Sequence, residues 1–166
     1  ELPRQHRAGV IQPAMAPHPG HDWPEIVQRR LVVVDREMRC LENGTWCPAK
    51  GGGPVGIWTC ASRNVVIEYC ESFGNHSQGL DGGGFDIDGG SENCVLQYNY
   101  THDNQGPGLM VYTYPYSSFH DRGSIVRFNI SVNDAARSDR YGGLWIRADG
   151  NKIEDLEVYN NTIITS

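Results

Sequence analysis

The sequence predicts an all-β domain folded as a right-handed parallel β-helix, a coil in which each turn of short strands stacks on the turn before. From residue 56 onward the chain divides into four similar passes, each of two short strands with no amphipathic helix between them. An aromatic residue recurs once per pass, with spacings of 29, 30 and 31 residues, at Tyr69, Tyr98, Phe128 and Tyr159. Such a period is typical of stacked coils. A β-sandwich is the competing fold, but its hairpins would give turn signals about every 8 to 12 residues.

The first strand of each pass begins with a glycine and then alternates: "GIWTC" at 56, "GFDID" at 84, "GLMVY" at 108 and "GLWIR" at 143. Successive side chains of a strand point to opposite faces, so the apolar phase is expected to point into the coil. The inward set is Ile57, Thr59, Phe85, Ile87, Leu109, Val111, Leu144 and Ile146. The outward set is Trp58, Cys60, Asp86, Asp88, Met110, Tyr112, Trp145 and Arg147.

The second strand of each pass reads "NVVIEYC" at 64, "NCVLQYN" at 93, "SIVRFN" at 124 and "LEVYN" at 156. The same alternation predicts the aromatic column inside, with Glu68, Gln97 and Arg127 outside. A polar residue follows the aromatic column at Cys70, Asn99, Asn129 and Asn160. Because a side-chain amide donates and accepts at once, these positions are expected to stack into an asparagine ladder at a bend.

Five N-x-S/T sequons, at Asn43, Asn75, Asn99, Asn129 and Asn160, are typical of a secreted glycoprotein. Three of them coincide with the expected ladder, where a glycan would have no access. The sequence therefore leaves Asn43 and Asn75 as the candidate glycosylation sites.

The two ends of the chain differ from the repeats. Residues 1–30 carry five of the nine prolines and show no period, which predicts an arm or cap before a β-helix domain at 31–166. From residue 27, "VQRRLVVVDREMRC" is expected to form a strand leading into the coil. The closing "VYNNTIITS" ends on an apolar repeat strand, so the coil is expected to continue, or its last turn to be covered, including by self-association through this end.

Composition narrows the partners and the compartment. The net charge of -6 argues against nucleic acid, whose binding needs a basic surface, and no apolar run is long enough to predict a membrane partner. Five cysteines are typical of an extracellular protein, and Cys40 with Cys47, on either side of "LENGTW", are expected to form a local disulfide. A secreted protein is therefore predicted.

The acidic segment "DGGGFDIDGG", residues 81 to 90, is the candidate for chemistry. Asp86 and Asp88 share one face of a strand with Cα atoms about 6.8 Å apart, within the roughly 6.5 to 9.5 Å between the carboxyl groups of inverting glycosidases. Neighbouring rungs lie about 4.8 Å apart, so the outward aromatic residues flank this pair, as a sugar-binding surface requires. Outward aspartates on a glycine-flanked strand can also serve solubility alone, and the sequence leaves that alternative open.

The stretch "NVVIEYCESFGNHSQGLDGGGFDIDGGSENCVLQYNYTHDNQGPGLMVY" resembles the right-handed β-helix superfamily of carbohydrate-active proteins, which includes pectate lyases, alginate-lyase-like enzymes and polygalacturonases. The resemblance covers about residues 55 to 166 and implies an extracellular, acidic polysaccharide as the partner. Polygalacturonase-type enzymes carry N-T-D, D-D, H-G and R-I-K on successive turns. The corresponding places hold Asp86-Ile87-Asp88, His102-Asp103 and Trp145-Ile146-Arg147, of which only the last basic residue matches.

Two reactions follow from these residues. A hydrolase would use Asp86 and Asp88 as its carboxyl pair, whereas a lyase would neutralise a uronate carboxylate with Arg147, or with calcium on the two aspartates, and remove the C5 proton with Tyr112 or His102. Trp58 and Trp145 are expected to bind the substrate, and calcium is the only cofactor suggested. The alternative is a non-catalytic structural or adhesive β-helix in a larger extracellular assembly.

Overall fold

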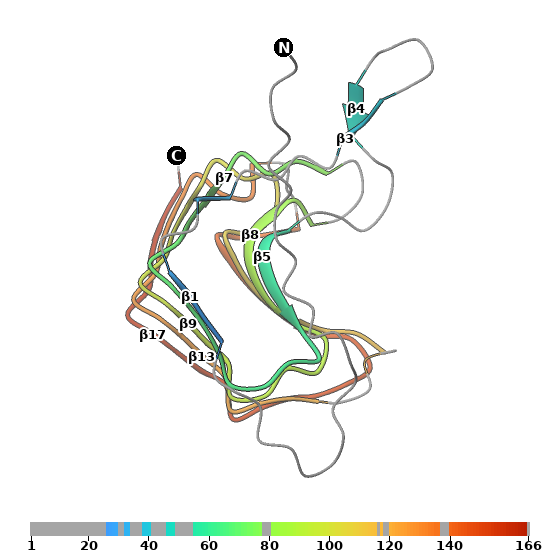
Figure 1. Cartoon of the computed structure of the whole chain (residues 1–166), viewed down its shortest axis with the longest axis vertical. Helices are drawn as coiled ribbons and strands as arrows, with labels where there is room; N and C mark the ends of the chain where they lie inside the picture. Colours follow the sequence, from blue (N-terminus) through green and yellow to red (C-terminus); the bar gives the residue numbers. More distant parts are fainter. Residues whose placement is uncertain are drawn as a thin grey trace.

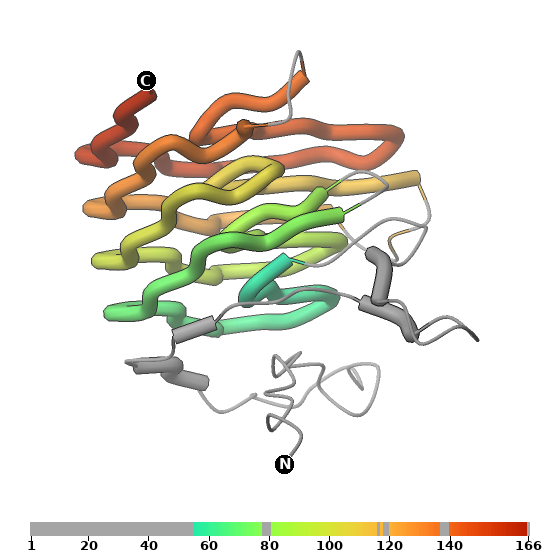
Figure 2. Tube along the Cα trace, turned by 90° about the horizontal axis from the view of Figure 1, so that it is seen from above, coloured from blue at the N-terminus to red at the C-terminus, as the bar shows by residue number. Residues whose placement is uncertain are grey.

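The structure is a computed structural model that describes residues 55–77, 81–115, 117, 120–136 and 140–165, together with the backbone of four short strands before residue 49. The described part is all-β, with parallel strands stacked as a β-solenoid of about three turns, which confirms the predicted fold class. Figure 2 shows the turns stacked in sequence order, with the C-terminal turn at one end. In this described part, no helix has the length and apolar character needed to cross a membrane.

Three parallel sheets form the sides of the coil (Figure 1). The first, named the β8 sheet, contains β5 (Val55–Cys60), β8 (Gly83–Asp88), β11 (Leu109–Thr113) and β15 (Leu144–Ala148). The β9 sheet contains β1 (Ile26–Arg29), β6 (Val65–Glu68), β9 (Val95–Gln97), β13 (Ile125–Arg127) and β17 (Glu157–Tyr159). The β10 sheet contains β2 (Val32–Val33), β7 (Glu71–Phe73), β10 (Tyr100–His102), β14 (Ile130–Val132) and β18 (Thr162–Ile164).

Two smaller pairings complete the described strands. Strands β12 (Asp121–Arg122) and β16 (Ile153–Glu154) pair in parallel between the β8 and β9 sheets along the chain. Strands β3 (Met38–Cys40) and β4 (Trp46–Pro48) pair antiparallel, with Cys40 opposite Trp46 and Cys47 opposite Arg39. The side chains of Cys40 and Cys47, and residue Asn43, lie outside the described residues, so the predicted disulfide and glycan there stay predictions. Among the described cysteines, Cys60 and Cys94 are free thiols.

The β8 sheet has the predicted register. Leu109 lies beside Phe85 and Leu144, and Tyr112 lies beside Asp88 and Arg147. The predicted inward residues of its first three strands are at most 2% exposed: Ile57, Thr59, Phe85, Ile87, Leu109 and Val111. Ile146, on the last turn, is 45% exposed although it follows the same alternation. Burial of this apolar column stabilises the coil, at about 25 cal/mol per Å² removed from water.

The glycine that opens each pass has a steric reason. A Cβ atom on Gly84 would overlap Thr101 Oγ1 and lie 2.7 Å from the carbonyl oxygen of Gly108, and one on Gly56 would overlap Ser72 Oγ. The hydroxyl groups of the β10 sheet therefore approach the backbone of the β8 sheet more closely than any side chain would allow. At Gly84 that approach is a hydrogen bond, in which Ser72 Oγ donates to the carbonyl oxygen at 3.0 Å.

The aromatic column points out of the coil, so its predicted inward orientation is wrong. Tyr69, Tyr98 and Phe128 are 53%, 44% and 36% exposed. Each has a positive φ between 54° and 55°, so the strand turns at this residue and the alternation that placed it inside ends one residue earlier. The rings instead stack along the outside, with centroids 5.3 Å apart for the first pair and 5.2 Å apart for the second. In the last pass the corner is Asn160, with φ 53°, and Tyr159 pairs with Arg127 instead.

The asparagine ladder is confirmed, with one correction. Asn99 is 2% exposed, and its Nδ2 donates to Asn129 Oδ1 at 3.0 Å. At the ladder position of the first pass, the backbone nitrogen of Cys70 donates to Asn99 Oδ1 at 3.0 Å. The last member is Asn161, which accepts from Asn129 Nδ2 at 3.0 Å, and not Asn160, because the last pass is two residues longer at this point.

The coil begins earlier than the predicted boundary at residue 31. Strand β1 pairs in parallel with β6, with Ile26 beside Val65, and β2 pairs with β7, with Val32 beside Glu71. The segment from residue 27 does lead into the coil, but it does so as two short strands that add a rung to the β9 and β10 sheets.

Candidate functional site

The outer face of the β8 sheet carries six of the predicted site residues in two columns. One column runs along Trp58, Asp86, Met110 and Trp145, and the other along Cys60, Asp88, Tyr112 and Arg147. All eight alternate with the inward residues of their strands, which are buried in β5, β8 and β11, so they project away from the coil. The structure therefore brings together Asp86, Asp88, Tyr112, Arg147 and the two tryptophans, as the sequence predicts.

Asp86 lies in the middle of this face and is 2% exposed. Among the described residues its Oδ1 has no hydrogen-bond partner. Burial first, and then the charges of Asp88, Asp81, Asp121 and the thiol of Cys60, raise the pKa of Asp86 well above its usual range. Asp86 is therefore a neutral carboxylic acid under conditions that ionise an ordinary aspartate.

Asp88 lies one column further along and is partly exposed. Its Oδ1 is buried and likewise has no partner among the described residues. Burial and the charges of Asp81 and Asp121 raise the pKa of Asp88 to about 7, against the opposing hydrogen bond from the backbone of Gly89. A half-buried carboxyl group with this pKa can hold a proton and release it near neutral pH, as a general acid does.

Asp121 of β12 is a third perturbed carboxyl group, and the sequence reasoning missed it. Its Oδ1 accepts hydrogen bonds from the backbone nitrogens of Gly90 at 2.9 Å and Ser91 at 2.6 Å, while its Oδ2 is buried without a described partner. Burial raises its pKa to about 6 despite these two bonds. Asp121 lies one turn after Ser91, at the same position of the repeat, and both residues are buried. An alignment of the repeats would therefore have shown an aspartate where the preceding pass has a small polar residue.

Aromatic and charged side chains extend the face beyond the aspartates. The ring centroids of Tyr112 and Trp145 lie 5.6 Å apart, and those of Tyr141 and Trp145 lie 5.1 Å apart in an edge-to-face arrangement. Arg147 Nη2 lies 2.7 Å from Asp149 Oδ2, and the hydroxyl of Tyr112 donates to the same oxygen at 3.3 Å. Asp149 follows β15 directly and was not predicted, because it lies beyond the alternating strand whose face was counted.

Tyr112 holds its proton firmly. Burial, followed by the charge of Asp149 and the hydrogen bond to it, raises the pKa of Tyr112. Cys60 is similar, because burial raises the pKa of its thiol, and its Sγ lies 3.5 Å from the hydroxyl of Tyr114. Neither group is poised to act as an anionic base or nucleophile.

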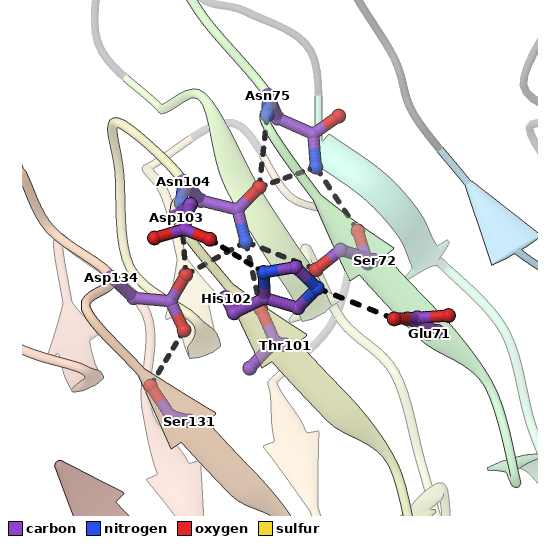
Figure 3. A network of polar contacts seen from close by, with 9 residues as sticks. All are labelled: Glu71, Ser72, Asn75, Thr101, His102, Asp103, Asn104, Ser131 and Asp134. Atoms are coloured by element: carbon purple, nitrogen blue, oxygen red, sulfur yellow. Dashed lines mark hydrogen bonds and ion pairs between the residues drawn. The ribbon is translucent and has the colours of Figure 1, made fainter.

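His102 is not part of this face. It belongs to β10, in a different sheet, where its ring is stacked between Phe73 at 4.8 Å and Tyr100 at 4.6 Å. Figure 3 shows the ring between two carboxylates: Nδ1 is 2.6 Å from Asp103 Oδ2 and Nε2 is 3.3 Å from Glu71 Oε1. Desolvation lowers the pKa of His102, but the two carboxylates outweigh it and leave that pKa raised.

A buried polar ladder lies beside His102 (Figure 3). Asn75 Nδ2 donates to Asn104 Oδ1 at 2.8 Å, and Asn104 Nδ2 donates to Asp134 Oδ1 at 2.8 Å. Asn75 is fully buried, with a second bond to Ser72 Oγ at 3.0 Å. The predicted glycosylation of Asn75 is incompatible with this arrangement, because the nitrogen that would carry the glycan lies inside the coil.

A metal ion on Asp86 and Asp88 would need further ligands from neighbouring side chains. Among the described residues, no group of three or more histidine, cysteine, aspartate or glutamate side chains is placed to hold a metal ion. Calcium on Asp86 and Asp88 therefore has no further acidic ligand in this part of the chain and stays a prediction.

No family model, curated protein or solved structure matches the chain.

Proposed function

We propose that the protein binds a polysaccharide on the outer face of the β8 sheet and hydrolyses a glycosidic bond there, with Asp88 as the general acid. The observation that carries this proposal is the half-buried Asp88 carboxyl group, with a pKa of about 7, on the strand position beside Tyr112. The resemblance to carbohydrate-active β-helix proteins supports the same substrate class.

Hydrolysis on this face needs two carboxyl groups in opposite protonation states. The proton of Asp88 passes to the glycosidic oxygen as the bond to the anomeric carbon breaks, and a water molecule adds to that carbon and gives up a proton to a carboxylate. Asp86 does not suit the second role, because its burial favours the neutral acid. Asp149 suits it better, since the guanidinium of Arg147 at 2.7 Å stabilises its charge.

A lyase receives less support from the same geometry. The hydroxyl of Tyr112 donates to Asp149, and its raised pKa disfavours the phenolate that would remove a C5 proton. His102 belongs to another sheet, and Arg147 already forms an ion pair with Asp149. The residues that β-elimination would need are therefore engaged or distant from the aspartates.

The test is product release from a panel of pectin, polygalacturonate, alginate and neutral glycans. Reducing ends report hydrolysis, and the ultraviolet absorbance of unsaturated sugar ends reports elimination. Asp88→Asn is expected to lower hydrolysis by roughly 100-fold or more, because it removes the acid, whereas the exposed Glu157→Gln is the matched control. Unsaturated products, or full activity in Asp88→Asn, would overturn the assignment of Asp88.

The alternative is a structural module in a larger assembly, which the exposed apolar side chains of the last turn favour. Ile146, Ile163 and Ile164 are 45%, 40% and 51% exposed. Silence across the glycan panel, together with concentration-dependent association that Ile163→Lys abolishes in sedimentation, would support this alternative over the enzyme.

A further inference from the structure

The outer face of the β8 sheet carries more acidic than basic side chains among its described residues. The described face carries the carboxyl groups of Asp86, Asp88 and Asp149, with Arg147 as the cation of its two columns. The main chain of Asp81 approaches the same side, where its nitrogen donates to Tyr141 Oη at 3.3 Å. Acidic groups therefore outnumber the cation in the part of the face that the structure describes.

Arg147 is engaged in the face itself. Its Nη2 contacts Asp149 Oδ2 at 2.7 Å, and its guanidinium lies 5.8 Å from the centre of the Trp145 ring. A uronate carboxylate that bound the remaining N–H groups of Arg147 would lie beside the carboxylate of Asp149. Like charges at such distances repel, and the repulsion is stronger where burial reduces screening by water.

The buried oxygens add to this repulsion. Oδ1 of Asp86 and Oδ1 of Asp88 are both buried, and neither has a hydrogen-bond donor among the described residues. Asp86 is 2% exposed, so water screens its carboxyl group only weakly from a charge on this face. Once either group ionises, an anionic ligand on this face meets an uncompensated charge.

A neutral sugar fits the same groups without this penalty. A hydroxyl group donates to a carboxylate and accepts from a guanidinium, so two neighbouring hydroxyls can engage the Arg147 and Asp149 pair without separating it. The apolar faces of a neutral sugar can also lie on the rings of Tyr112 and Trp145, which are only partly buried.

We infer that this face takes a neutral glycan and rejects polyuronates, an inference that rests on the proposed polysaccharide function. It departs from the acidic substrate that the resemblance implies. The selectivity arises from the acidic excess of the face and from the pairing of its arginine with Asp149.

The experiment compares oligosaccharides matched in length and linkage, with and without the carboxyl group. Galacto-oligosaccharides are titrated against oligogalacturonides, and manno-oligosaccharides against oligomannuronates, in a calorimeter with a chelator present. At about pH 8, the neutral member of at least one pair is expected to bind roughly tenfold or more tightly than its uronate. At about pH 5 the gap is expected to narrow, because Asp88, whose pKa is about 7, becomes protonated.

Asp149→Asn tests the cause of the selectivity. It frees Arg147 and removes one carboxylate, so uronate affinity is expected to rise at least several-fold while neutral affinity falls or stays unchanged. Glu157→Gln, an exposed acidic residue of β17, removes one charge elsewhere and is expected to change neither affinity.

The outcomes separate the two proposals. Tighter binding of the uronates by the unmodified protein, in the presence of the chelator or with calcium in its place, would overturn the neutral-glycan inference and leave the polysaccharide function standing. An unchanged preference in Asp149→Asn would overturn the role of the ion pair. Absence of binding to either member of both pairs, from folded protein, would overturn the proposed function and this inference together.

Discussion

Two acidic regions of this coil differ in the hydrogen bonding of their buried carboxyl oxygens. Inside the coil, Asp134 Oδ1 accepts from Asn104 Nδ2 at 2.8 Å, and its Oδ2 accepts from Ser131 Oγ at 2.7 Å. On the outer face of the β8 sheet, Asp86 and Asp88 each have a buried oxygen without a partner among the described residues. The first arrangement is what a stable core requires, and the second costs stability.

The difference shows which polar groups serve the fold and which are candidates for chemistry. Burial raises the pKa of Asp134 as it does that of Asp88, but hydrogen bonds from Ser131, Asn104 and Thr101 oppose the rise in the pKa of Asp134. Asp88 has one opposing backbone bond, and its pKa reaches about 7. Buried carboxyl groups whose proton affinity is not offset by donors are typical of functional sites. Four substitutions test this comparison, from the largest expected effect to the smallest.

The interior ladder is expected to be the more fragile region. Asn104→Ala removes both hydrogen bonds that Asn75 donates to Asn104, at 2.9 Å and 2.8 Å, and the bond that Asn104 Nδ2 donates to Asp134 Oδ1 at 2.8 Å. We expect a loss of about 3 to 5 kcal/mol in the free energy of unfolding, measured in urea. Glu157→Ala, an exposed change in β17, is the control and is expected to change that free energy by less than about 0.5 kcal/mol. Equal effects of the two substitutions would show that the ladder is not a structural element.

The acidic face is expected to respond in the opposite direction. Because the folded pKa of Asp88 lies above the unfolded value of about 3.9, the folded protein binds more protons between these values, and its stability falls as pH rises from about 4 to 7. Asp88→Asn removes this loss and is expected to raise the free energy of unfolding on the order of 2 kcal/mol at about pH 8, with little change at about pH 4. Denaturation curves at the two pH values check it.

If Asp88→Asn is more stable and has also lost hydrolysis, then the residue that hydrolysis requires is the one that destabilises the fold. A destabilised Asp88→Asn at about pH 8 would mean that Asp88 has partners that support the fold, and the comparison between the two regions would fail.

The site was predictable from the sequence where alternation continues and not where it ends. Within the β8 sheet the period and the alternation together placed Asp86, Asp88 and Arg147 on one face. Asp149 lies just after β15, where alternation no longer assigns a face, and Asp121 contributes through backbone hydrogen bonds that no side-chain pattern records. His102 was grouped with the site because of a motif position, although its strand belongs to another sheet.

The fold shows the same limit at the corners. Residues with positive φ recur five apart, at Asn64, Tyr69 and Gly74 in one pass and at Asn93, Tyr98 and Asp103 in the next. Asparagine, glycine and aspartate are usual at such positions, but tyrosine is not, so its identity gave no sign of a corner. The rings at these corners stack on one another, and this contact favours tyrosine and phenylalanine there despite the positive φ. A strand pattern alone could not indicate this stacking.

The aromatic column outside the coil is expected to contribute less than either acidic region. Tyr98 stacks on Tyr69 and on Phe128 at centroid distances of 5.3 and 5.2 Å. Tyr98→Leu is expected to lower the free energy of unfolding by about 1 to 2 kcal/mol, since each aromatic pair is worth about 0.5 to 1.5 kcal/mol. Tyr98→Phe keeps both stacks and is expected to change little. A similar loss in both variants would assign the effect to the hydroxyl group instead, and thermal unfolding of the two distinguishes them.

Substitution of His102 is expected to change stability least. It distinguishes the pH dependence of stability due to His102 from that due to Asp88. Its folded pKa is raised, so its contribution to stability is present below the unfolded value of about 6.5 and is lost as pH rises through the folded value. Solvent screening at this partly exposed site limits the contribution to less than about 1 kcal/mol. In the Asp88→Asn background, where the response of Asp88 is absent, His102→Gln is expected to reduce the remaining fall in stability between about pH 5 and 8. His76→Gln, at an exposed histidine, is the control, and an equal change in both would exclude Glu71 and Asp103 as the cause.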